Sequence, residues 1–391
     1  MTATDLTDDD RELAALGYKQ ELVRTLGAFS TFATGFAFIS ILTGLFLLFG
    51  FNYSSGGPAS IWAWCAAVLG QMLFAVVFAE LAARYPLAGS VYNWSKQLAS
   101  KTTSWLAGVS MALAFVVSTA AVALAMQAIL PNISSVFVVY GRASSTSDSE
   151  INAVILGSIM IAGTTIVSLM GTKFKAKVNN FGVSVELVGC SVLVLLLLLH
   201  AKRGPEVVFK TNNTGLGHSG GYLGALMLCL LLGLTIQWGF DTAGAVSEET
   251  VNPRKTNPHA IIRALLASGV FGALLLVTAF MSLKNLNDSH IASGGLAYVL
   301  KSAVGSVLGN ILLSCSAIAV FVCGLANQTG AVNMLFAMAR DNALPGSERI
   351  AKVSVRSRTP VFPTILVAAL AVAFLLALMK QPGILLVATH A

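Results

Sequence analysis

Residues 221–249 have the sequence GYLGALMLCLLLGLTIQWGFDTAGAVSEE. About twenty apolar residues suffice to cross a bilayer, and this apolar run meets Trp238-Gly239-Phe240-Asp241 and continues beyond it. A glycine beside an acidic residue near the middle of a membrane helix is costly unless the helix is broken there. Broken helices at membrane depth line cavities, and in secondary transporters they form the substrate site. The stretch therefore predicts a membrane helix that is interrupted at residues 238–241.

The first apolar segment, residues 27–51, contains another interruption around Thr43 and Gly44. One glycine-marked, weakened helix near the start of each half of a membrane chain is typical of an inverted-repeat transporter. An unwound turn at residues 40–44 would expose backbone N–H groups at the positive end of a half-helix, which suits a carboxylate. The alternative is that Gly44 only allows two helices to pack closely.

The composition of the whole chain is that of a membrane protein. Of its 391 residues, 56% are hydrophobic and only 10% are charged, against about 25% charged in soluble domains. The pattern predicts an all-α polytopic membrane protein in which every span is long enough to cross the bilayer. We expect nine spans, at residues 27–51, 58–82, 104–131, 152–171, 180–200, 221–247, 264–283, 306–338 and 360–379.

The basic residues indicate the orientation of the chain. With the N-terminus inside, 17 of the 24 Lys and Arg residues fall in cytoplasmic loops and 7 fall on the other side, as the positive-inside rule expects. The net charge of +7 is therefore a topology signal in a protein whose partner is the lipid bilayer. We expect no nucleic-acid partner, because no soluble stretch interleaves basic and aromatic residues.

Motifs for catalysis or metal binding are absent from the sequence. The five cysteines all fall inside apolar spans without a CxxC pair, and no pair of histidines has metal-ligand spacing. The sequence also contains no GxxxxGK[ST] or HExxH motif. We therefore expect neither an enzyme nor an ATP-driven pump, and neither a cofactor nor a metal site.

The spans suggest a division of the chain into two five-helix units. A cytoplasmic tail at residues 1–26 precedes a first repeat at 27–203, with helices 1–5, and an extracellular loop at 204–220. The second repeat, at 221–391, holds helices 6–9 and an incomplete tenth. Only residues 383–391 remain for that tenth span, which needs about twenty residues. We therefore expect the second repeat to be truncated after helix 9.

Several motifs resemble the amino acid–polyamine–organocation (APC) superfamily of permeases, most closely its amino acid/choline and GABA permease branch. The resemblance covers the chain from about Leu22 onward. The motifs that carry it are residues 39–46 in span one, Gly56-Gly57-Pro58, Ala79-Glu80-Leu81, Tyr85-Pro86, Gly239-Phe240-Asp241, Ser247-Glu248-Glu249-Thr250, Asn252-Pro253-Arg254, Ala339-Arg340-Asp341 and Thr359-Pro360.

This resemblance implies a five-plus-five inverted-repeat fold, like that of the leucine transporter, with broken helices 1 and 6. It also implies that spans one, three, six and eight surround the solute. The sequence departs from the family at Ser90, where a second glycine is usual, and at Asn333 and Asn342. We expect none of these three residues to touch the substrate site.

The candidate substrate-binding residues lie at the two interruptions: Ser40, Ile41, Thr43, Gly44, Gln237, Trp238, Gly239 and Asp241. A carboxylate near the midplane by default marks a substrate or ion pathway, so Asp241 is also a candidate for coupling. The simpler interpretation is that Asp241 caps the second half-helix. Trp238 could cover the solute or merely pack between helices.

Other acidic residues invite structural interpretations. Glu186 in span five is the second coupling candidate, although we favour a carboxylate near the cytoplasmic end that pairs with Lys177 or Arg84. Glu248 and Glu249 lie beside Arg254 and Lys255, which predicts a salt-bridge cluster that holds the inward gate. The full set of predicted gate residues is Glu80, Arg84, Glu248, Glu249 and Arg254.

The leading hypothesis is a secondary active transporter that moves a small amino acid or related amine across the plasma membrane by alternating access. The substrate class includes amino acids, GABA, choline and polyamine-like amines. The sequence leaves proton coupling, sodium coupling and exchange open. The alternative is a non-transporting protein on the same scaffold, either a substrate sensor or an inactive truncated paralogue, and a comparison of uptake with binding separates the two.

Overall fold

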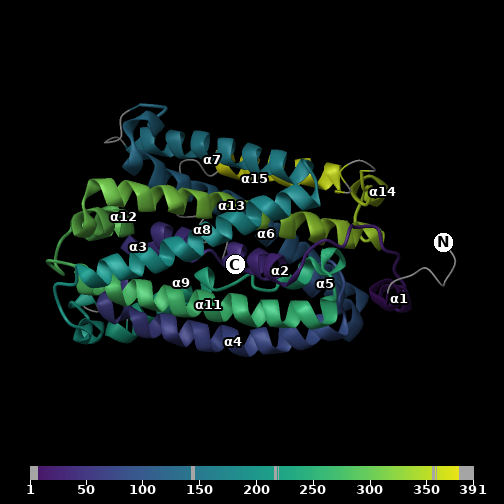
Figure 1. Cartoon of the computed structure of the whole chain (residues 1–391), viewed down its shortest axis with the longest axis horizontal. Coiled ribbons are helices and arrows are strands. Elements are labelled where there is room, and N and C mark those ends of the chain that lie inside the picture. The colour runs from purple at the N-terminus through teal and green to yellow at the C-terminus, as the bar shows by residue number, and fades with distance from the viewer. Residues whose placement is uncertain are drawn as a thin grey trace.

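The computed structural model describes residues 8–141, 146–214, 218, 220–354, 357 and 359–377, and helices dominate throughout (Figure 1). Within these ranges the only extended pairing is an isolated parallel bridge between Leu26 and Thr250. Seven helices in the described part of the chain are long and apolar enough to cross a membrane. They correspond to α2–α3 (Ala28–Ile39 and Ile41–Gly56), α4 (Ile61–Arg84), α6 (Lys101–Ile133), α7 (Thr146–Leu169), α8 (Thr172–Leu199), α11 (Pro253–Ser282) and α13 (Ser306–Arg340).

Two shorter apolar helices, α9 (Gly221–Ile236) and α15 (Val361–Ala377), complete the set of predicted spans. The prediction of an all-α polytopic membrane protein is therefore confirmed. The incomplete tenth span at residues 383–391 and the first seven residues of the tail lie outside the described residues.

Short helices connect the spans at both ends of the bundle. One end, called here the tail face, carries residues 8–26 with α1 (Asp8–Ala15), the helix α5 (Ser90–Leu98) and α14 (Ser347–Ile350) (Figure 1). The opposite face carries η4 (Pro205–Phe209) and α12 (His290–Val304). The helix α5 lies between span two and span three.

Both predicted breaks are present. Span one consists of α2 and α3 with Ser40 between them, and span six consists of α9, residues 237–241, the short α10 (Thr242–Ala245) and η6 (Ser247–Glu249). The bridge between Leu26 and Thr250 places the start of span one beside the end of span six at the tail face. At the opposite face the Tyr222 hydroxyl, at the start of α9, donates to the carbonyl of Gly56 at 2.8 Å. The two broken spans therefore lie side by side and run in opposite directions, as an inverted repeat requires.

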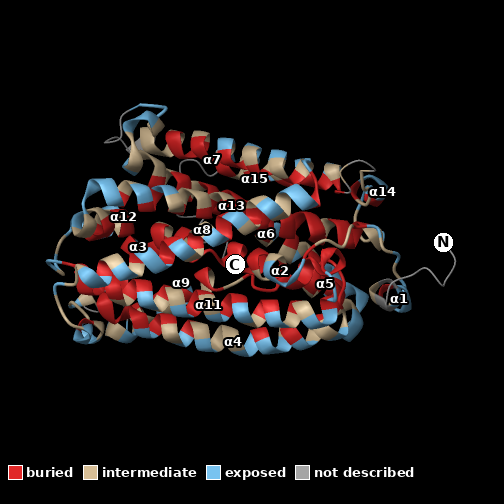
Figure 2. Ribbon diagram, in the orientation of Figure 1, coloured by how far each residue is buried: buried red, intermediate tan, exposed pale blue. Residues whose placement is uncertain are grey.

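The outer surface of the bundle is apolar. Large side chains on α4, α8 and α11 remain exposed, among them Leu73, Leu195 and Val270, and exposed positions follow the outward stripes of these helices (Figure 2). A contiguous apolar surface of this size is not stable in water and fits a lipid environment. Polar side chains lie instead inside the bundle near the two breaks, and the described residues enclose a cavity there. The division of the chain into repeats at 27–203 and 221–391 stays a prediction.

Candidate functional site

The break in span one is a single residue wide. Ser40 has φ 36° and ψ 92°, α2 ends at Ile39, and α3 resumes at Ile41. A serine in this positive-φ region is strained, and its hydroxyl is held by two contacts. It shares a hydrogen bond of 2.6 Å with the Thr43 hydroxyl and donates to Oε1 of Glu186 at 2.9 Å. Glu186 therefore holds the break in span one from the neighbouring helix α8.

Glu186 does not pair with Lys177 or Arg84, so the interpretation favoured from the sequence is wrong. Lys177 is nine residues earlier on the same helix, roughly 13 Å along the axis at 1.5 Å per residue, and Arg84 pairs with Glu80. Oε1 of Glu186 also accepts a hydrogen bond of 3.2 Å from the backbone N–H of Leu42. The side chain is fully buried, and its Oε2 has no hydrogen-bond partner among the described residues.

The break in span six lies where the sequence predicts it. After α9 ends at Ile236, Gly239 has φ 87°, and α10 begins at Thr242. A Cβ atom at Gly239 would collide with the ring of Phe38, so this position requires glycine for both its backbone and its contact. Phe38 in turn packs edge-on against Trp238, with ring centroids 5.2 Å apart.

Asp241 precedes α10, but its side chain makes no capping hydrogen bond. The capping interpretation is therefore wrong. Its Oδ2 instead accepts a hydrogen bond of 2.8 Å from the hydroxyl of Ser90 at the start of α5, and both side chains are buried. Ser90 thus contacts a candidate site residue, contrary to the expectation from the sequence. Span six is tied at its break to α5 through this contact.

A cavity lies between the two breaks and extends along α3 toward the opposite face. Its walls come from span one (α2–α3), span three (α6), span six (α9) and span eight (α13), the four helices expected around a solute. Most of the lining is apolar, with hydroxyls from Thr43, Ser118 and Thr235. The lining residues are Phe38, Ile39, Thr43, Gly44, Leu47, Leu48, Ser118, Ala121, Val122, Thr235, Ile236, Trp238 and Cys323.

Only some of the candidate substrate-binding residues line this cavity. Thr43, Gly44 and Trp238 line it. The cavity lining does not include Ser40, Ile41, Gln237, Gly239 and Asp241, which are buried beside the breaks.

Thr43 and Gly44 belong to the first turn of α3, so the expectation that they are unwound is wrong. A Cβ atom at Gly44 would approach the side chain of Ile236 to 2.6 Å. Gly44 therefore allows span one and span six to pack closely, as the alternative interpretation proposed.

Gln237 is unusual because its amide has no partner. The side chain is completely buried, and neither Nε2 nor Oε1 has a hydrogen-bond partner among the described residues. An unsatisfied buried polar group costs about 1–3 kcal/mol. A group of this kind at a helix break is a candidate contact for a polar solute.

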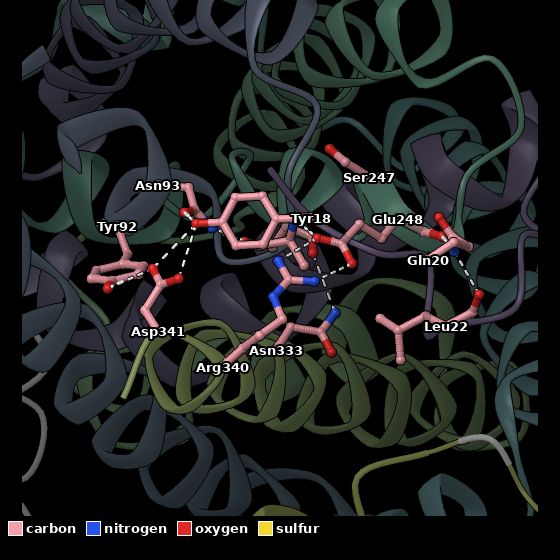
Figure 3. A network of polar contacts seen from close by, with 12 residues as sticks. Tyr18, Gln20, Leu22, Tyr92, Asn93, Ser247, Glu248, Asn333, Arg340 and Asp341 are labelled. Carbon is pink, nitrogen blue, oxygen red and sulfur yellow. Dashed lines mark hydrogen bonds and ion pairs between the residues drawn. The ribbon is translucent and has the colours of Figure 1, made fainter. Parts of the chain in front are cut away.

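An ion pair closes the tail face around the end of span six (Figure 3). The guanidinium of Arg340, at the end of α13, contacts Glu248 through two bonds of 2.7 Å, and Glu248 is fully buried. Oε1 of Glu248 also accepts the backbone N–H of Ala88 at 3.0 Å. The predicted partners Arg254 and Lys255 are exposed at the start of α11, and the cation on Glu248 is Arg340 instead.

Beside this ion pair, Asp341 collects three donors. Its Oδ2 accepts hydrogen bonds from Lys96 at 2.7 Å and from Tyr92 at 2.9 Å, and its Oδ1 accepts the Tyr18 hydroxyl at 3.0 Å. The Tyr18 ring also lies 4.2 Å from the guanidinium carbon of Arg340, a cation–π contact. Burial raises the pKa of the Tyr18 hydroxyl above its ordinary value. The tail is therefore anchored on the helices that close this face.

The rest of the tail follows span six. The side-chain amide of Gln20 donates to the carbonyl of Glu248 at 2.8 Å, and Arg24 donates to the carbonyls of Ser247 and Thr250 at 3.2 and 3.0 Å. These bonds satisfy carbonyl groups that the short helices at the end of span six leave open.

The predicted gate residues form more than one cluster. Glu80 and Arg84 make an i,i+4 pair of 2.6 Å on the surface, which contributes little to stability. Glu249 is separate from Glu248 and faces Lys175 of α8, with 3.9 Å between Nζ and Oε2. The side-chain amide of Asn333 lies 3.5 Å from Oε1 of Glu249, so this departure from the family motif also contacts a predicted gate residue.

Sequence reasoning missed the roles of Ser90, Lys175 and Tyr18, and it did not pair Arg340 with Glu248. Two signals were present: Ser90 replaces a usual glycine, and Arg340 belongs to a matched motif. The partners come from helices far apart in sequence, and neither spacing nor composition encodes which of them meet.

Two antiparallel broken helices around a shared cavity, inside a bundle with an apolar exterior, define a multi-pass membrane transporter. Comparison with known proteins agrees. The family model "Amino acid permease" matches residues 26–388. The chain belongs to this amino acid permease family, and it is a permease-type transporter and not an enzyme.

Curated relatives carry similar descriptions. The chain is 30% identical over 365 residues to the amino-acid permease BAT1 of Arabidopsis thaliana, covering 88% of this chain and 70% of that protein. It is 28% identical over 355 residues to the methylthioribose transporter of Bacillus subtilis, covering 89% and 74%. It is 22% identical over 377 residues to the GABA-specific permease of Saccharomyces cerevisiae, covering 92% and 64%.

Proposed function

We propose that this protein is a secondary active transporter for a small amino acid or related amine, and that it works by alternating access. The observation that carries the proposal is the cavity between the two breaks, lined by Thr43, Trp238 and apolar side chains. The names of the relatives, which include amino-acid, GABA and methylthioribose transporters, support a small polar solute.

Half-helix ends supply the polar contacts of such a site. The positive end of the α3 dipole lies at the break, but the Leu42 N–H there already donates to Glu186, so the last carbonyls of α9, which suit an ammonium group, are the half-helix ends that face a solute. The unpartnered amide of Gln237 adds a donor and an acceptor beside the break. The apolar walls then accommodate the rest of a small solute. Phe38 and Trp238 are part of these walls, and Phe115 packs against both rings.

Glu186 is our first candidate for coupling. Ionised carboxylates are costly to bury without a counter-cation, and they tend to become neutral instead. No cationic side chain lies within 4.0 Å of Glu186 among the described residues. One of its oxygens contacts the break in span one at Ser40 and Leu42, so binding or release of a proton there would change the contacts that hold the break. This arrangement favours a proton as the coupling ion. Asp241, beside the other break, is the second candidate.

We further propose that the tail face is cytoplasmic and that the protein lies in the plasma membrane. The split of 17 basic residues against 7 supports this orientation under the positive-inside rule. The contacts of Glu248, Arg340 and Tyr18 would then close the cytoplasmic gate, while the cavity at the breaks extends toward the outside.

Uptake into proteoliposomes tests the proposal. The purified chain is reconstituted and given radiolabelled alanine, leucine, GABA, choline, putrescine or methylthioribose, with an imposed proton gradient, a sodium gradient or neither. We expect uptake of at least one amino acid or amine above empty liposomes, accelerated by the proton gradient. Binding of a solute without uptake under any gradient would contradict transport and favour the sensor alternative.

A further inference from the structure

Two cavities at the tail face are separate from the one at the breaks, and they share Lys175, Glu249 and Thr329. The first, the hydroxyl-lined chamber, has walls that include Ser168, Thr172, Thr359 and Thr364. The second, the apolar chamber, has walls that include Val246, Leu325 and Ala326. The oppositely charged side chains of Lys175 and Glu249 therefore lie where the hydroxyl-lined chamber meets the apolar chamber.

Glu249 is buried, Lys175 is largely buried, and the contact between their charges is incomplete. The Lys175 and Glu249 side chains are 14% and 3% exposed, and 3.9 Å separates Nζ from Oε2. A charge-assisted hydrogen bond is about 2.7–2.9 Å long, and the neighbouring pair of Glu248 and Arg340 reaches 2.7 Å twice. Oε2 of Glu249 has no hydrogen-bond donor among the described residues. Because buried ion pairs need close geometry and further hydrogen bonds to offset desolvation, this pair is suited to receive groups from a ligand.

The charges also select the class of ligand. An inorganic anion would be attracted by Lys175 and repelled by Glu249. A metal ion would be attracted by Glu249 and repelled by Lys175. A zwitterionic α-amino acid satisfies both, with its carboxylate on Lys175 and its ammonium on Glu249. The buried side-chain oxygen of Asn179, which lines the apolar chamber and lacks a donor among the described residues, offers the ammonium a second acceptor.

We propose that Lys175 and Glu249 form a second binding site for a zwitterionic amino acid, on the tail-face side of the breaks. Each chamber has a volume of about 20 Å³ in this closed arrangement, so the ligand enters only when the tail moves away and the two chambers widen. Its side chain then lies on the walls of the apolar chamber, and its carboxylate points toward Lys175 and the hydroxyl-lined chamber. The assignment of this site to solute release rests on the transport function proposed above. A solute that leaves the breaks would be held here before it reaches the cytoplasm.

The tail covers this second site. Leu22 is part of the wall of the hydroxyl-lined chamber and Leu26 is part of the wall of the apolar one, and both are at most 5% exposed. Gln20 anchors the same segment on the end of span six (Figure 3), and Arg24 adds a hydrogen bond to the carbonyl of Ser247. Release from the site therefore requires the tail to move, which links its contacts to the exit of solute.

Equilibrium binding to the purified full chain tests the site. The probes are leucine, a zwitterion with an apolar side chain, and isoamylamine, which has the same side chain and no carboxylate. We expect two leucine sites per chain in the wild type. Lys175→Met and Glu249→Gln should each weaken one of them about tenfold or more, since each removes a charge-assisted contact. Lys177→Met, which changes an exposed lysine on the same helix, is the matched control and should bind like the wild type.

A cysteine at Thr329, which lines both chambers, gives a second measurement that does not depend on the charged variants folding. Leucine should slow labelling of Thr329→Cys by a thiol reagent in the purified protein, and isoamylamine at the same concentration should protect it far less. Equal protection by both probes, or none by leucine, would overturn the site. Uptake is a separate measurement. Transport together with unaltered leucine binding in Lys175→Met would refute only this second site. Leucine binding without uptake would refute only the proposed transport function.

Discussion

The Ser90 hydroxyl donates a hydrogen bond of 2.8 Å to Oδ2 of Asp241 and thereby joins α5 to the break in span six. Ser90 has φ 29°, a region in which non-glycine residues are disfavoured by roughly 1–2 kcal/mol. The family motif that the sequence resembles implies a glycine at this position. A serine kept in a strained conformation, with its hydroxyl on a buried carboxylate, indicates that the contact to Asp241 compensates for the backbone cost.

Substitutions at Ser90 separate the strain from the hydrogen bond. Ser90→Ala removes the hydroxyl and keeps the strain, and it should lower stability by about 1–3 kcal/mol because a buried carboxylate loses its donor. Ser90→Gly loses the same donor but relieves the strain, so it should be destabilised less. Thermal unfolding in detergent measures the order, which we expect to be wild type, then glycine, then alanine. An alanine variant at least as stable as the glycine variant would contradict this account.

The sequence was sufficient to predict the helical spans and the break in span six. Gly239 beside an acidic residue in an apolar run is a local signal, and its φ of 87° is the local consequence. The break in span one was predicted at residues 40–44, and it lies at Ser40, the first residue of that range. The break was expected around Gly44 because glycine weakens a helix. Gly44 is helical, however, and allows close packing against Ile236.

The actual break at Ser40 depends on a partner that local sequence does not reveal. Glu186 lies 146 residues away and holds the Ser40 hydroxyl. The same holds for Asp241 with Ser90 and for Glu248 with Arg340. Which charges meet is decided by helix packing, so sequence could name Glu248 and Glu249 at the tail face but not their partners Arg340 and Lys175.

Replacement of Asp241 by asparagine removes the charge and keeps an acceptor for Ser90. If the carboxylate takes part in substrate or proton binding, Asp241→Asn should abolish gradient-driven uptake while the protein remains folded and inserted. Asp241→Ala, which also removes the acceptor, should in addition lose stability. Near-normal uptake by the asparagine variant would exclude a role for the charge and leave Glu186 as the coupling candidate.

Glu186→Gln provides the matched test of proton coupling. Its amide oxygen can still accept from the Ser40 hydroxyl and from the Leu42 N–H, so the break in span one should persist. An amide cannot bind and release a proton at neutral pH. We expect the variant to exchange labelled for unlabelled solute across the membrane and to lose accumulation driven by a proton gradient. Accumulation at the wild-type level under that gradient would refute the assignment.

The orientation of the tail can be tested with cysteines at exposed positions. Ala14 is exposed at the tail face and Ser289 is exposed in the loop before α12 at the opposite face. In intact cells, a membrane-impermeant thiol reagent should leave Ala14→Cys unlabelled and label Ser289→Cys, with permeabilisation exposing the first. The reverse pattern would invert the topology and place the closed gate outside.

The last prediction concerns the ion pair of Glu248 with Arg340. Arg340→Met would leave a fully buried carboxylate without its cation, a change that typically costs about 3–5 kcal/mol. Its thermal midpoint should fall well below that of Arg349→Met, a matched change at an exposed arginine on α14.

The double variant Glu248→Gln/Arg340→Met tells a gate from a purely structural pair. It removes the unpaired charge and keeps an acceptor for the N–H of Ala88, so much of the lost stability should return, since neutral replacements of buried ion pairs are often tolerated. The link between α13, span six and the tail would still be weakened, because Tyr18 loses the closer of its two cation–π partners as well. A cysteine at Ser168, which lines the hydroxyl-lined chamber, should then be labelled faster from the tail face than in the unmodified background. Recovered stability with unchanged labelling would show that the pair stabilises the fold without controlling access.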